Sequence, residues 1–361
     1  MVSRRRATVG SDTSAGAGRR PSMDDVARAA GVSKGAVSKV IRNAYGVSDA
    51  MRTRVEVAIQ ELGYRPRIAA RAMRGSSFSI GLEIPNLGND FLTQIMQGAA
   101  AQLAGSSYQL MIAPGIGELS GAPVLENLAD RQVDGLIAIS PEVTPAWLEN
   151  LALELPIVLI GRHDDSVNYD TVTNDDVAGT TLALNHLRTL GHERIAHLTM
   201  RMQPEAQPRA PHSLRLLTYE QMTADAGLDS IIEYCSDAQD DAYAVARELL
   251  SRDPSITAIF AGHDTLAIGV LRALADLGLT TSDVSVVGYD DTPVAGHPLV
   301  SLSTVSQFGE KMGAMAIQLL MERISGERTT ARHYQIHPEL RVRASSQAAR
   351  GRNLPESRTG N

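Results

Sequence analysis

Short apolar runs rich in β-branched residues recur between residues 79 and 290 and alternate with stretches in which apolar positions follow the helical spacing. The runs are SIGLEI, YQLMIA, DGLIAI, PIVLI, RIAHL, TAIFAG and DVSVVGYD. This alternation is typical of a parallel sheet covered by helices on both faces, and the length calls for two such lobes. Because such folds bind ligands at the carboxyl ends of their strands, we expect a binding site in the loops that follow these runs.

Residues 21–65 show a different pattern, in which turn signals separate three short helical stretches. The first begins with a capping-box pattern of Ser22 and Asp25 and ends at Gly31. The third begins after Ser48 and ends at Gly63. The expected inward positions are Val26, Ala29 and Ala30, then Val37, Val40 and Ile41, then Val55, Ala58, Ile59 and Leu62. Two helices joined by a three-residue turn, with a third in support, present the second helix to a DNA major groove.

The outward face of the second helix is polar and basic. Lys34 and Lys39 can donate hydrogen bonds to guanine edges or phosphates, and Ser33 at the helix N-terminus can bind a phosphate. The candidate DNA-contacting residues are Ser33, Lys34, Gly35, Ser38, Lys39, Arg42, Tyr45 and Tyr64. A small helical cap is the alternative, but a cap would not need the four arginines that flank this face between residues 52 and 67.

Charge is distributed unevenly along the chain. Residues 1–75 hold 15 basic and 6 acidic side chains, although the whole chain carries a formal net charge of −7. A basic end on an acidic body indicates a polyanion partner for that end only. Residues 1–20 are rich in Gly, Ser and Ala and show no periodicity, so we expect a disordered arm there.

Several other classes of protein are not supported by the sequence. It has no run of about 18 apolar residues, and no apolar stretch follows the N-terminal arginines, so we expect a cytoplasmic protein with no membrane span or secretory signal. The only cysteine, Cys235, has no partner for a disulfide or a zinc site and is expected to be a buried thiol.

Signals of enzymatic chemistry are also missing. The GIGELSG string of residues 115–121 has the wrong spacing for a dinucleotide fingerprint, and the chain has no GxxxxGK or GxSxG motif. His186, His192 and His197 lack metal-ligand spacing. We therefore expect no catalytic residues, no metal and no cofactor.

The strings DVARAAGVSKGAVSKVI, VSDAMRTRVEVAIQELGYRP and IAARAM resemble the headpiece and hinge of the lactose/galactose repressor family, and the likeness continues through most of residues 22–345. The resemblance implies a three-helix helix-turn-helix headpiece and a hinge helix, followed by a two-lobed α/β sensor domain like a periplasmic binding protein. The expected divisions are an arm (1–20), a headpiece (21–65), a hinge helix (66–75), a two-lobed body (76–345) and a disordered tail (346–361).

In this family the hinge segment, which here follows Tyr64 and Pro66, folds into a helix on DNA, and the two hinge helices of a dimer enter the minor groove. Met73 stands where the family usually has a leucine wedge, and it is apolar and long enough for that role. The recognition helix departs from the family at Ala36, Lys39 and Arg42, which replace the usual Thr, Arg and Asn.

The strings VDGLIAIS, PIVLIGR, NHLRTLGHERIAHL, TAIFAGHDTLAIG, DVSVVGYDD and STVSQFGEKMG extend the resemblance to the body. The likeness implies that the chain crosses between the lobes near Gly161–Asp165, Ser303–Ser306 and His333–Pro338. The effector contacts carried over by resemblance are Phe91, Leu92, Arg162, Arg209, Arg215 and Asp264. A guanidinium and a carboxylate can bind sugar hydroxyls, and aromatic rings can stack on a sugar ring, for which the candidates are Phe91, Trp147, Tyr219 and Tyr289.

These observations predict a homodimeric DNA-binding transcription regulator, in the usual case for this family a repressor. Its affinity for a palindromic double-stranded operator would depend on a small-molecule effector, a sugar or a related metabolite, bound between the lobes. Two alternatives stay open at this stage: an architectural DNA-binding dimer without effector response, and a sugar-binding protein of the periplasmic type. The tail from Ser346 has no heptad pattern, so we expect no tetramer formed through it.

Overall fold

The computed structural model describes residues 21–41, 44–64, 76–117, 120–200 and 209–349. The chain divides into two compact units, residues 1–77 and 78–361. The predicted arm (1–20), the predicted hinge helix (66–75) and residues 350–361 of the predicted tail lie outside the described residues, as do Arg42 and Met73.

The first unit contains the three predicted helices: α1 (Met23–Ala30), α2 (Lys34–Ile41) and α3 (Asp49–Leu62). The capping box is formed, because the Ser22 amide donates to Asp25 Oδ2 at 2.8 Å and the Ser22 hydroxyl accepts from the Asp25 amide. Ala27 is buried in the headpiece core, whereas Ala29, which we expected inside, is exposed. The short α1 therefore packs through the spacing i, i+1, i+4, which points position 29 to solvent.

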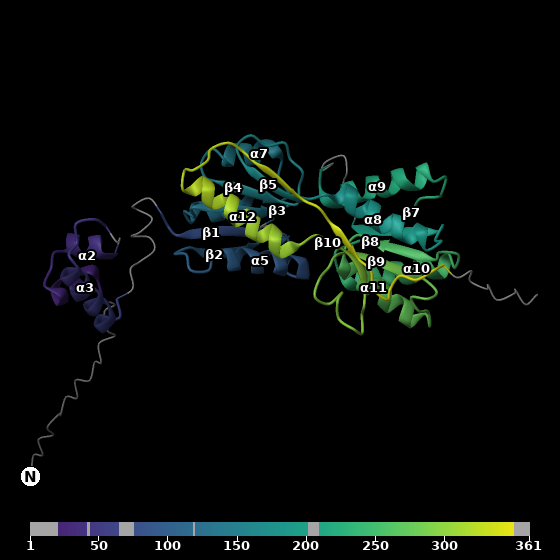
Figure 1. Ribbon diagram of the computed structural model, residues 1–361, viewed down its shortest axis with the longest axis horizontal. Coiled ribbons are helices and arrows are strands. Elements are labelled where there is room, and N and C mark those ends of the chain that lie inside the picture. Colours follow the sequence, from purple (N-terminus) through teal and green to yellow (C-terminus); the bar gives the residue numbers. More distant parts are fainter. Residues whose placement is uncertain (1–20, 42–43, 65–75, 118–119, 201–208, 350–361) are drawn as a thin grey trace, which may run out of the picture. The chain divides into compact units, whose positions relative to one another are not determined.

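The second unit is a two-lobed body with two six-stranded sheets (Figure 1). The N-lobe sheet has the order β11-β5-β4-β3-β1-β2, and the C-lobe sheet has the order β12-β10-β9-β8-β6-β7. The N-lobe strands are β1 (Ser79–Ile84), β2 (Gln109–Pro114), β3 (Gly135–Ile139), β4 (Ile157–Ile160), β5 (Asp170–Asn174) and β11 (His333–Ile336). The C-lobe strands are β6 (Ile195–Met200), β7 (Ile231–Cys235), β8 (Ala258–Ala261), β9 (Ser285–Asp290), β10 (Ser303–Ser306) and β12 (Glu339–Arg341). All neighbouring pairs are parallel except β10 with β12.

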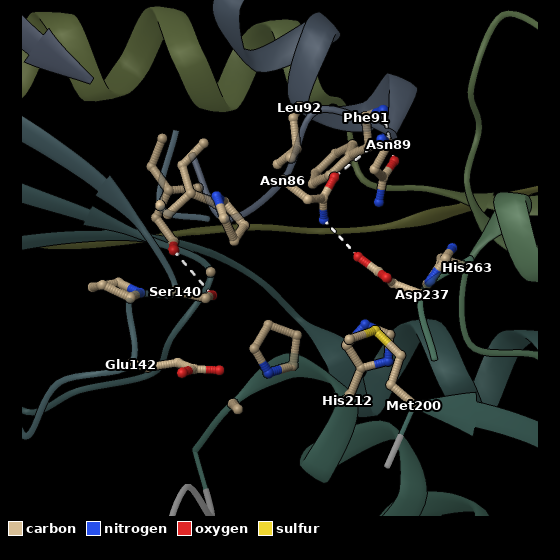
Figure 2. Close-up of a pocket in the computed structure, with 18 of the residues that line it drawn as sticks. Asn86, Asn89, Phe91, Leu92, Ser140, Glu142, Met200, His212, Asp237 and His263 are labelled. Carbon is tan, nitrogen blue, oxygen red and sulfur yellow. Dashed lines mark hydrogen bonds between the residues drawn. The ribbon is translucent and has the colours of Figure 1, made fainter. Parts of the chain in front are cut away.

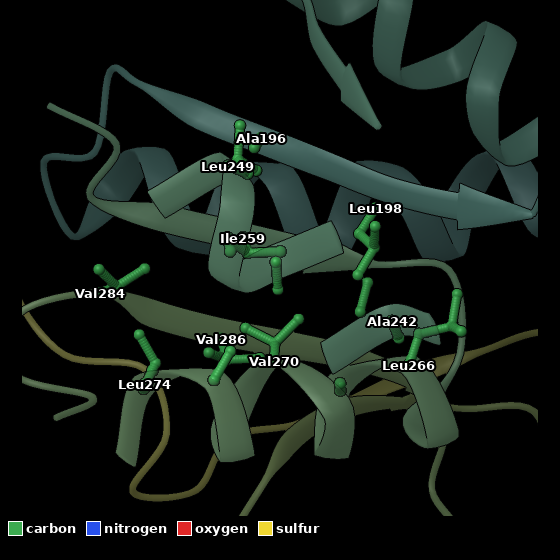
Figure 3. Close-up of a cluster of buried hydrophobic side chains, with 14 of the residues drawn as sticks. Ala196, Leu198, Ala242, Leu249, Ile259, Leu266, Val270, Leu274, Val284 and Val286 are labelled. Carbon is green, nitrogen blue, oxygen red and sulfur yellow. The ribbon is translucent and has the colours of Figure 1, made fainter. Parts of the chain in front are cut away.

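Helices cover both faces of each sheet, as the alternating pattern predicted. The N-lobe helices are α5 (Asp90–Gln102), α6 (Ala122–Asp130), α7 (Pro145–Leu151) and α12 (Gly309–Ile324). The C-lobe helices are α8 (Asp176–Thr189), α9 (Pro211–Asp225), α10 (Gln239–Arg252) and α11 (Asp264–Asp276). In the N-lobe, α5 and α12 enclose one core and α6 and α7 another, and in the C-lobe α10 and α11 lie opposite α8 and α9. Figure 3 shows the core under α10 and α11, where Val270 and Leu274 face the strand that carries Val286.

Glycine allows the closest helix contact of the N-lobe. A Cβ at Gly98 on α5 would lie 1.8 Å from the carbonyl oxygen of Glu310, and one at Gly313 on α12 would lie 2.0 Å from that of Ile95. Only residues without a side chain let the two backbones approach this closely. This contact joins α12, which follows the C-lobe strand β10 in the chain, firmly to the N-lobe.

The chain crosses between the lobes three times, and two crossings agree with the prediction. One of these two crossings lies between β10 and α12, and the other lies between β11 and β12. The prediction for residues 161–165 is wrong, because β4 is followed by β5 in the same sheet and the crossing comes after Asn174. The strand β5 reads DTVTN, so it has no apolar run by which to recognise it, and its buried Asp170 is paired with Arg323 and Arg328.

The body extends beyond its predicted end at residue 345. Ser346 is buried, and its hydroxyl lies 2.7 Å from the hydroxyl of Ser303 and 2.8 Å from His186 Nε2. The Ala349 amide donates to the carbonyl of Leu190 at 2.8 Å. Residues 346–349 therefore belong to the C-lobe, a boundary set by polar contacts that leave no periodic signal in the sequence.

The structure also bears on the single cysteine and on the expected absence of a membrane span. Cys235 is buried at the end of β7, and burial raises the pKa of its thiol to about 12, which agrees with an inert thiol. No helix in the described ranges is long and apolar enough to cross a membrane.

Candidate functional site

The recognition helix α2 presents a basic surface. Lys34, Gly35 and Lys39 are exposed, and the Ser33 hydroxyl accepts from the Ala36 amide at 3.1 Å, so it caps the helix. Lys34 Nζ also lies 2.9 Å from an exposed carboxylate oxygen of Asp24. A phosphate that binds Lys34 would have to compete with this pair, which is weak because both groups are solvated.

Two predicted DNA contacts sit differently from the others. Ser38, which we expected on the outward face, is only 8% exposed. Because α2 packs against both α1 and α3, a wider part of its surface is buried than the row of apolar residues alone. Tyr45 is fully exposed after α2, and Tyr64 packs on the headpiece core.

A cavity of about 560 Å³ lies between the two lobes of the body. It opens at the carboxyl ends of several parallel strands, where the fold predicted a binding site. Its polar lining residues are Glu83, Asn86, Asn89, Ser120, Ser140, Glu142, His212, Arg215, Asp237, His263, Asp290 and Gln307. Apolar side chains complete the wall, among them Phe91, Leu92, Ile116, Ile139, Pro141, Met200 and Met312. This volume and mixture of surfaces suit a polar ring-sized molecule.

Three of the six predicted effector residues line this cavity: Phe91, Leu92 and Arg215. Arg162, Arg209 and Asp264 are not among the lining residues. Of the four aromatic residues proposed to stack on a sugar, only Phe91 lines the cavity, while Tyr219 and Tyr289 are buried in the C-lobe core.

Arg162 is buried and is held by protein groups. Its Nε lies 2.9 Å from Asp164 Oδ1, and its Nη1 donates to the carbonyls of Pro141 at 3.0 Å and Val143 at 2.7 Å. These bonds fix the loop between Pro141 and Val143, which carries Glu142 into the cavity wall. Arg162 thus shapes the cavity from behind, and its direct contact with an effector stays a prediction.

Arg209 and Asp264 are also occupied by protein partners. Arg209 Nη1 lies 2.5 Å from Asp165 Oδ2 and 3.2 Å from the carbonyl of His163. Asp264 accepts hydrogen bonds from the Thr292 amide and hydroxyl, both at 2.8 Å, and from the Thr304 hydroxyl at 2.6 Å. Burial raises the pKa of Asp264 to about 6. It ties the loop after β9 to β10, and its contact with an effector likewise stays a prediction.

Arg215 forms the positive part of the C-lobe wall. Its Nε lies 2.8 Å from Asp176 Oδ1, its Nη1 donates to the Gly262 carbonyl at 2.7 Å, and its Cζ lies 3.7 Å from the centre of the Tyr289 ring. Only 3% of Arg215 is exposed. The residue is therefore locked in place, and its charge is offset by the Asp176 carboxylate.

Two histidines beside Arg215 offer hydrogen bonds that the protein does not use. His263 is 2% exposed, and neither of its ring nitrogens has a hydrogen-bond partner among the described residues. Nδ1 of His212 is also without one, and the two rings meet edge to face at 5.6 Å. Burial lowers the pKa of His263 to about 3, so its imidazole is neutral and offers one donor and one acceptor.

Side-chain amides connect the walls of the cavity. Asn86 Nδ2 donates to Asp237 Oδ2 at 3.1 Å, which links the loop after β1 to the loop after β7 across the cavity (Figure 2). Gln307 Nε2 lies 2.5 Å from Asp290 Oδ1, and Asn89 also bonds this carboxyl group. Burial raises the pKa of Asp290 well above the usual range. The two lobes are thus held together by a few polar contacts around an open interior.

Glu83 is a lining residue that the sequence analysis missed. It is the penultimate residue of the buried strand β1, is 2% exposed, and accepts a hydrogen bond from the Ile139 amide to Oε2 at 3.0 Å. Burial raises its pKa to about 7, with a smaller contribution from nearby Glu142, while the bond from Ile139 acts in the opposite direction. Gly115 leaves room for this carboxyl group, because a Cβ there would lie 2.9 Å from Oε1. The sequence signal that could have identified Glu83 is the single acidic residue within the apolar run SIGLEI.

Comparison with known proteins places both units. Residues 22–67 match the family described as "Bacterial regulatory proteins, lacI family", and residues 184–346 match the periplasmic binding protein-like domain. The chain is 32% identical over 344 residues to the "HTH-type transcriptional regulator CelR" of Thermobifida fusca, covering 91% of this chain and 98% of that protein. It is 31% identical over 332 residues to the "Ribose operon repressor" of Escherichia coli K12, covering 90% and 99%.

Solved structures of transcription regulators are similar to this chain over both units. A lac repressor dimer bound to operator and the anti-inducer ONPF has a TM-score of 0.78 at 25% identity and covers 91% of this chain and 100% of that one. A complex of the transcriptional regulator CelR with cellobiose has a TM-score of 0.66 at 30% identity, with the same coverage.

Proposed function

This chain belongs to the lacI family of bacterial regulatory proteins, and we propose that it is a repressor whose operator affinity is set by a small molecule bound between the N-lobe and the C-lobe. It is a DNA-binding transcription regulator, since the family consists of regulators rather than enzymes. The observation that carries the proposal is the cavity of about 560 Å³ in a chain whose headpiece exposes a basic recognition helix.

The proposed DNA complex contains two copies of the chain on a roughly palindromic operator. Each copy places α2 in a major groove, with Lys34 and Lys39 as donors to guanine edges or phosphates. The two hinge segments, residues 66–75, enter the central minor groove, where Met73 inserts between base pairs. The lac repressor dimer bound to operator, to which the body and headpiece are similar, supports this arrangement. We place this function in the cytoplasm, where operator DNA is available.

The proposed effector is a sugar or a related polar metabolite. Phe91 and Leu92 offer an apolar surface to one face of a ring, while the opposite wall offers Arg215 and the unpartnered nitrogens of His263. The similarity of this chain to CelR, whose structure is a complex with cellobiose, supports a ligand of this class. Because the cavity has walls from both lobes, a ligand that contacts both favours one relative orientation of the lobes over others.

The coupling to DNA follows from this geometry. A change in the orientation of the two N-lobes of a dimer moves the points from which the hinge segments start. The effector can shift the operator equilibrium only by its difference in affinity for the two orientations, which in allosteric proteins is typically about fivefold to 150-fold.

The test uses the full-length protein and a fluorescent pool of palindromic duplexes with a central CG step. Anisotropy is measured with and without cellobiose and ribose, and Phe91→Ala serves as the matched variant of the cavity. We expect saturable, sequence-selective binding that one compound shifts at least about fivefold, and no shift in the variant. Binding that ignores both sequence and compound and disappears with salt would instead support an architectural DNA-binding dimer.

A further inference from the structure

The cavity between the lobes carries an excess of acidic side chains. Two acids line it from each lobe: Glu83 and Glu142 from the N-lobe, Asp237 and Asp290 from the C-lobe. Arg215 is the only lysine or arginine among the described lining residues, and its guanidinium is paired with Asp176 behind the wall. Burial lowers the pKa of both lining histidines, so they add no positive charge near neutral pH.

The four acids differ in how much hydrogen-bonding capacity they keep. The two aspartates accept hydrogen bonds from side-chain amides, as described above. Glu83 accepts a single bond, to Oε2, and Glu142 has no hydrogen-bond or ion-pair partner among the described residues. The N-lobe wall therefore presents carboxylate oxygens that the protein does not satisfy itself.

Buried groups hold the backbone on both sides of Glu142. Arg162 donates to the carbonyl groups immediately before and after it, at 3.0 and 2.7 Å, and is itself paired with the buried Asp164. Figure 2 shows Glu142 beside Ser140 on one wall, with His212 and Met200 on the facing wall. The fold thus fixes the backbone of Glu142 at the cavity wall, and its exposed side chain can turn toward a ligand there.

His263 is an independent sign that a polar molecule occupies this cavity. It is 2% exposed, it lines the cavity, and both of its ring nitrogens are without a partner. A buried polar group without a partner destabilises a protein, and a polar molecule bound in the cavity would supply the bonds that the protein does not. The cavity therefore recognises polar groups on the C-lobe side and has unsatisfied carboxylates on the N-lobe side.

We propose that the effector is a polar ring compound with a protonated amine, such as an amino sugar, and that Glu83 and Glu142 bind the ammonium group. An ammonium group has three hydrogen-bond donors and no acceptor. It can therefore donate to the carboxylate oxygens that receive no hydrogen bond from the protein. A phosphorylated or carboxylated compound would meet the exposed acids Glu142 and Asp237 and no unpaired lysine or arginine on the described wall. This inference rests on the proposed function, since it specifies the small molecule that the cavity takes.

The test compares matched ligands on the full-length protein by isothermal titration calorimetry at pH 7. The probes are β-1,4-linked diglucosamine, its N-acetylated form and cellobiose, together with glucosamine, glucose and glucose 6-phosphate. Within each set the ring skeleton is kept and the amine is replaced by a hydroxyl or an acetamide, and glucose 6-phosphate adds an anionic group at another position of the same ring. We expect each amine to bind about tenfold to a hundredfold more tightly than its hydroxyl analogue, because charge-assisted hydrogen bonds are the stronger ones.

Two variants assign the preference to the proposed residues. Glu83→Gln and Glu142→Gln keep side-chain size, and together they should reduce the ratio of amine affinity to hydroxyl-analogue affinity to less than about threefold, whatever their effect on the affinity for either compound alone. Glu154→Gln changes an exposed acid away from the cavity and should leave the preference as it is. Operator binding without ligand checks that each variant is folded.

The inference is overturned if the amines bind no more tightly than their neutral analogues, if the phosphorylated sugar binds best, or if neither amine binds. It is also overturned if the amine preference survives in the doubly substituted protein. These outcomes are distinct from failure of the proposed function, because a neutral compound that shifts operator affinity would uphold the regulator while refuting the amine.

Discussion

Glu83 should lower the stability of the body as pH rises, and its replacement by Gln should remove that effect. The unfolded chain has an ordinary glutamate pKa, whereas burial in the folded protein raises the pKa from 4.5 to about 7. A group whose folded pKa is raised stabilises the fold fully below its unfolded pKa, and this contribution is lost as pH rises to the folded pKa. The shift from 4.5 to about 7 corresponds to about 3 kcal/mol of lost stability above pH 7.

The assay is urea unfolding of wild type and Glu83→Gln between pH 5 and pH 8, without ligand. The advantage of the Gln variant should grow by about 2.5 kcal/mol across this range, because Gln keeps the hydrogen bond from Ile139 and has no proton to lose. Glu154→Gln, an exposed position, should show a constant difference. A constant difference for Glu83→Gln as well would refute the reasoning, since it would mean that Glu83 is ionised in the fold at an ordinary pKa.

Three further predictions concern other contacts. Lys39→Ala should weaken operator binding about tenfold and, if Lys39 binds a phosphate, lower the salt slope by about one, as seen in a salt titration. Asn86→Ala removes the bond to Asp237, so a bound ligand should dissociate severalfold faster in stopped-flow measurements. Arg215→Met leaves the Asp176 carboxylate buried without its guanidinium and should cost about 3 to 5 kcal/mol in urea unfolding. Adding Asp176→Asn should recover part of that loss, and no recovery would argue against the ion pair.

Local signals in the sequence were sufficient for the ends of the headpiece helices and for most of their buried positions. The Ser22 capping box, the left-handed turn at Gly31 and the spacing of Val55 and Ala58 each depend on residues within one helix or turn, and the structure confirms all of them. The burial of Ser38 was missed, because it depends on how α2 packs against two other helices at once.

Long-range pairs limited what could be predicted for the body. The strand β5 looks polar in the sequence, yet it is fully buried because Asp170 meets Arg323 and Arg328 from α12 and the segment after it. Arg162 was assigned to an effector by resemblance, but in the structure it donates to the carbonyls of Pro141 and Val143 in the loop before α7. Partners this far apart in the sequence cannot be identified from residue spacing.

Glu83, in contrast, could have been identified from the sequence. An acid among five apolar or small residues in a central strand has to be buried, and burial of a carboxyl group at a strand end that faces a cavity is typical of a functional position. A stability cost of about 3 kcal/mol at neutral pH is consistent with a residue kept for binding.

The most direct test of the central claim is reciprocity between the two sites. Operator affinity is measured with and without a saturating amount of the compound that binds the cavity, and the affinity for that compound is measured with and without operator. The account predicts that the two affinities change by the same factor, of at least about fivefold, because the coupling is a single free energy. A compound that saturates the cavity and leaves operator affinity unchanged would contradict it.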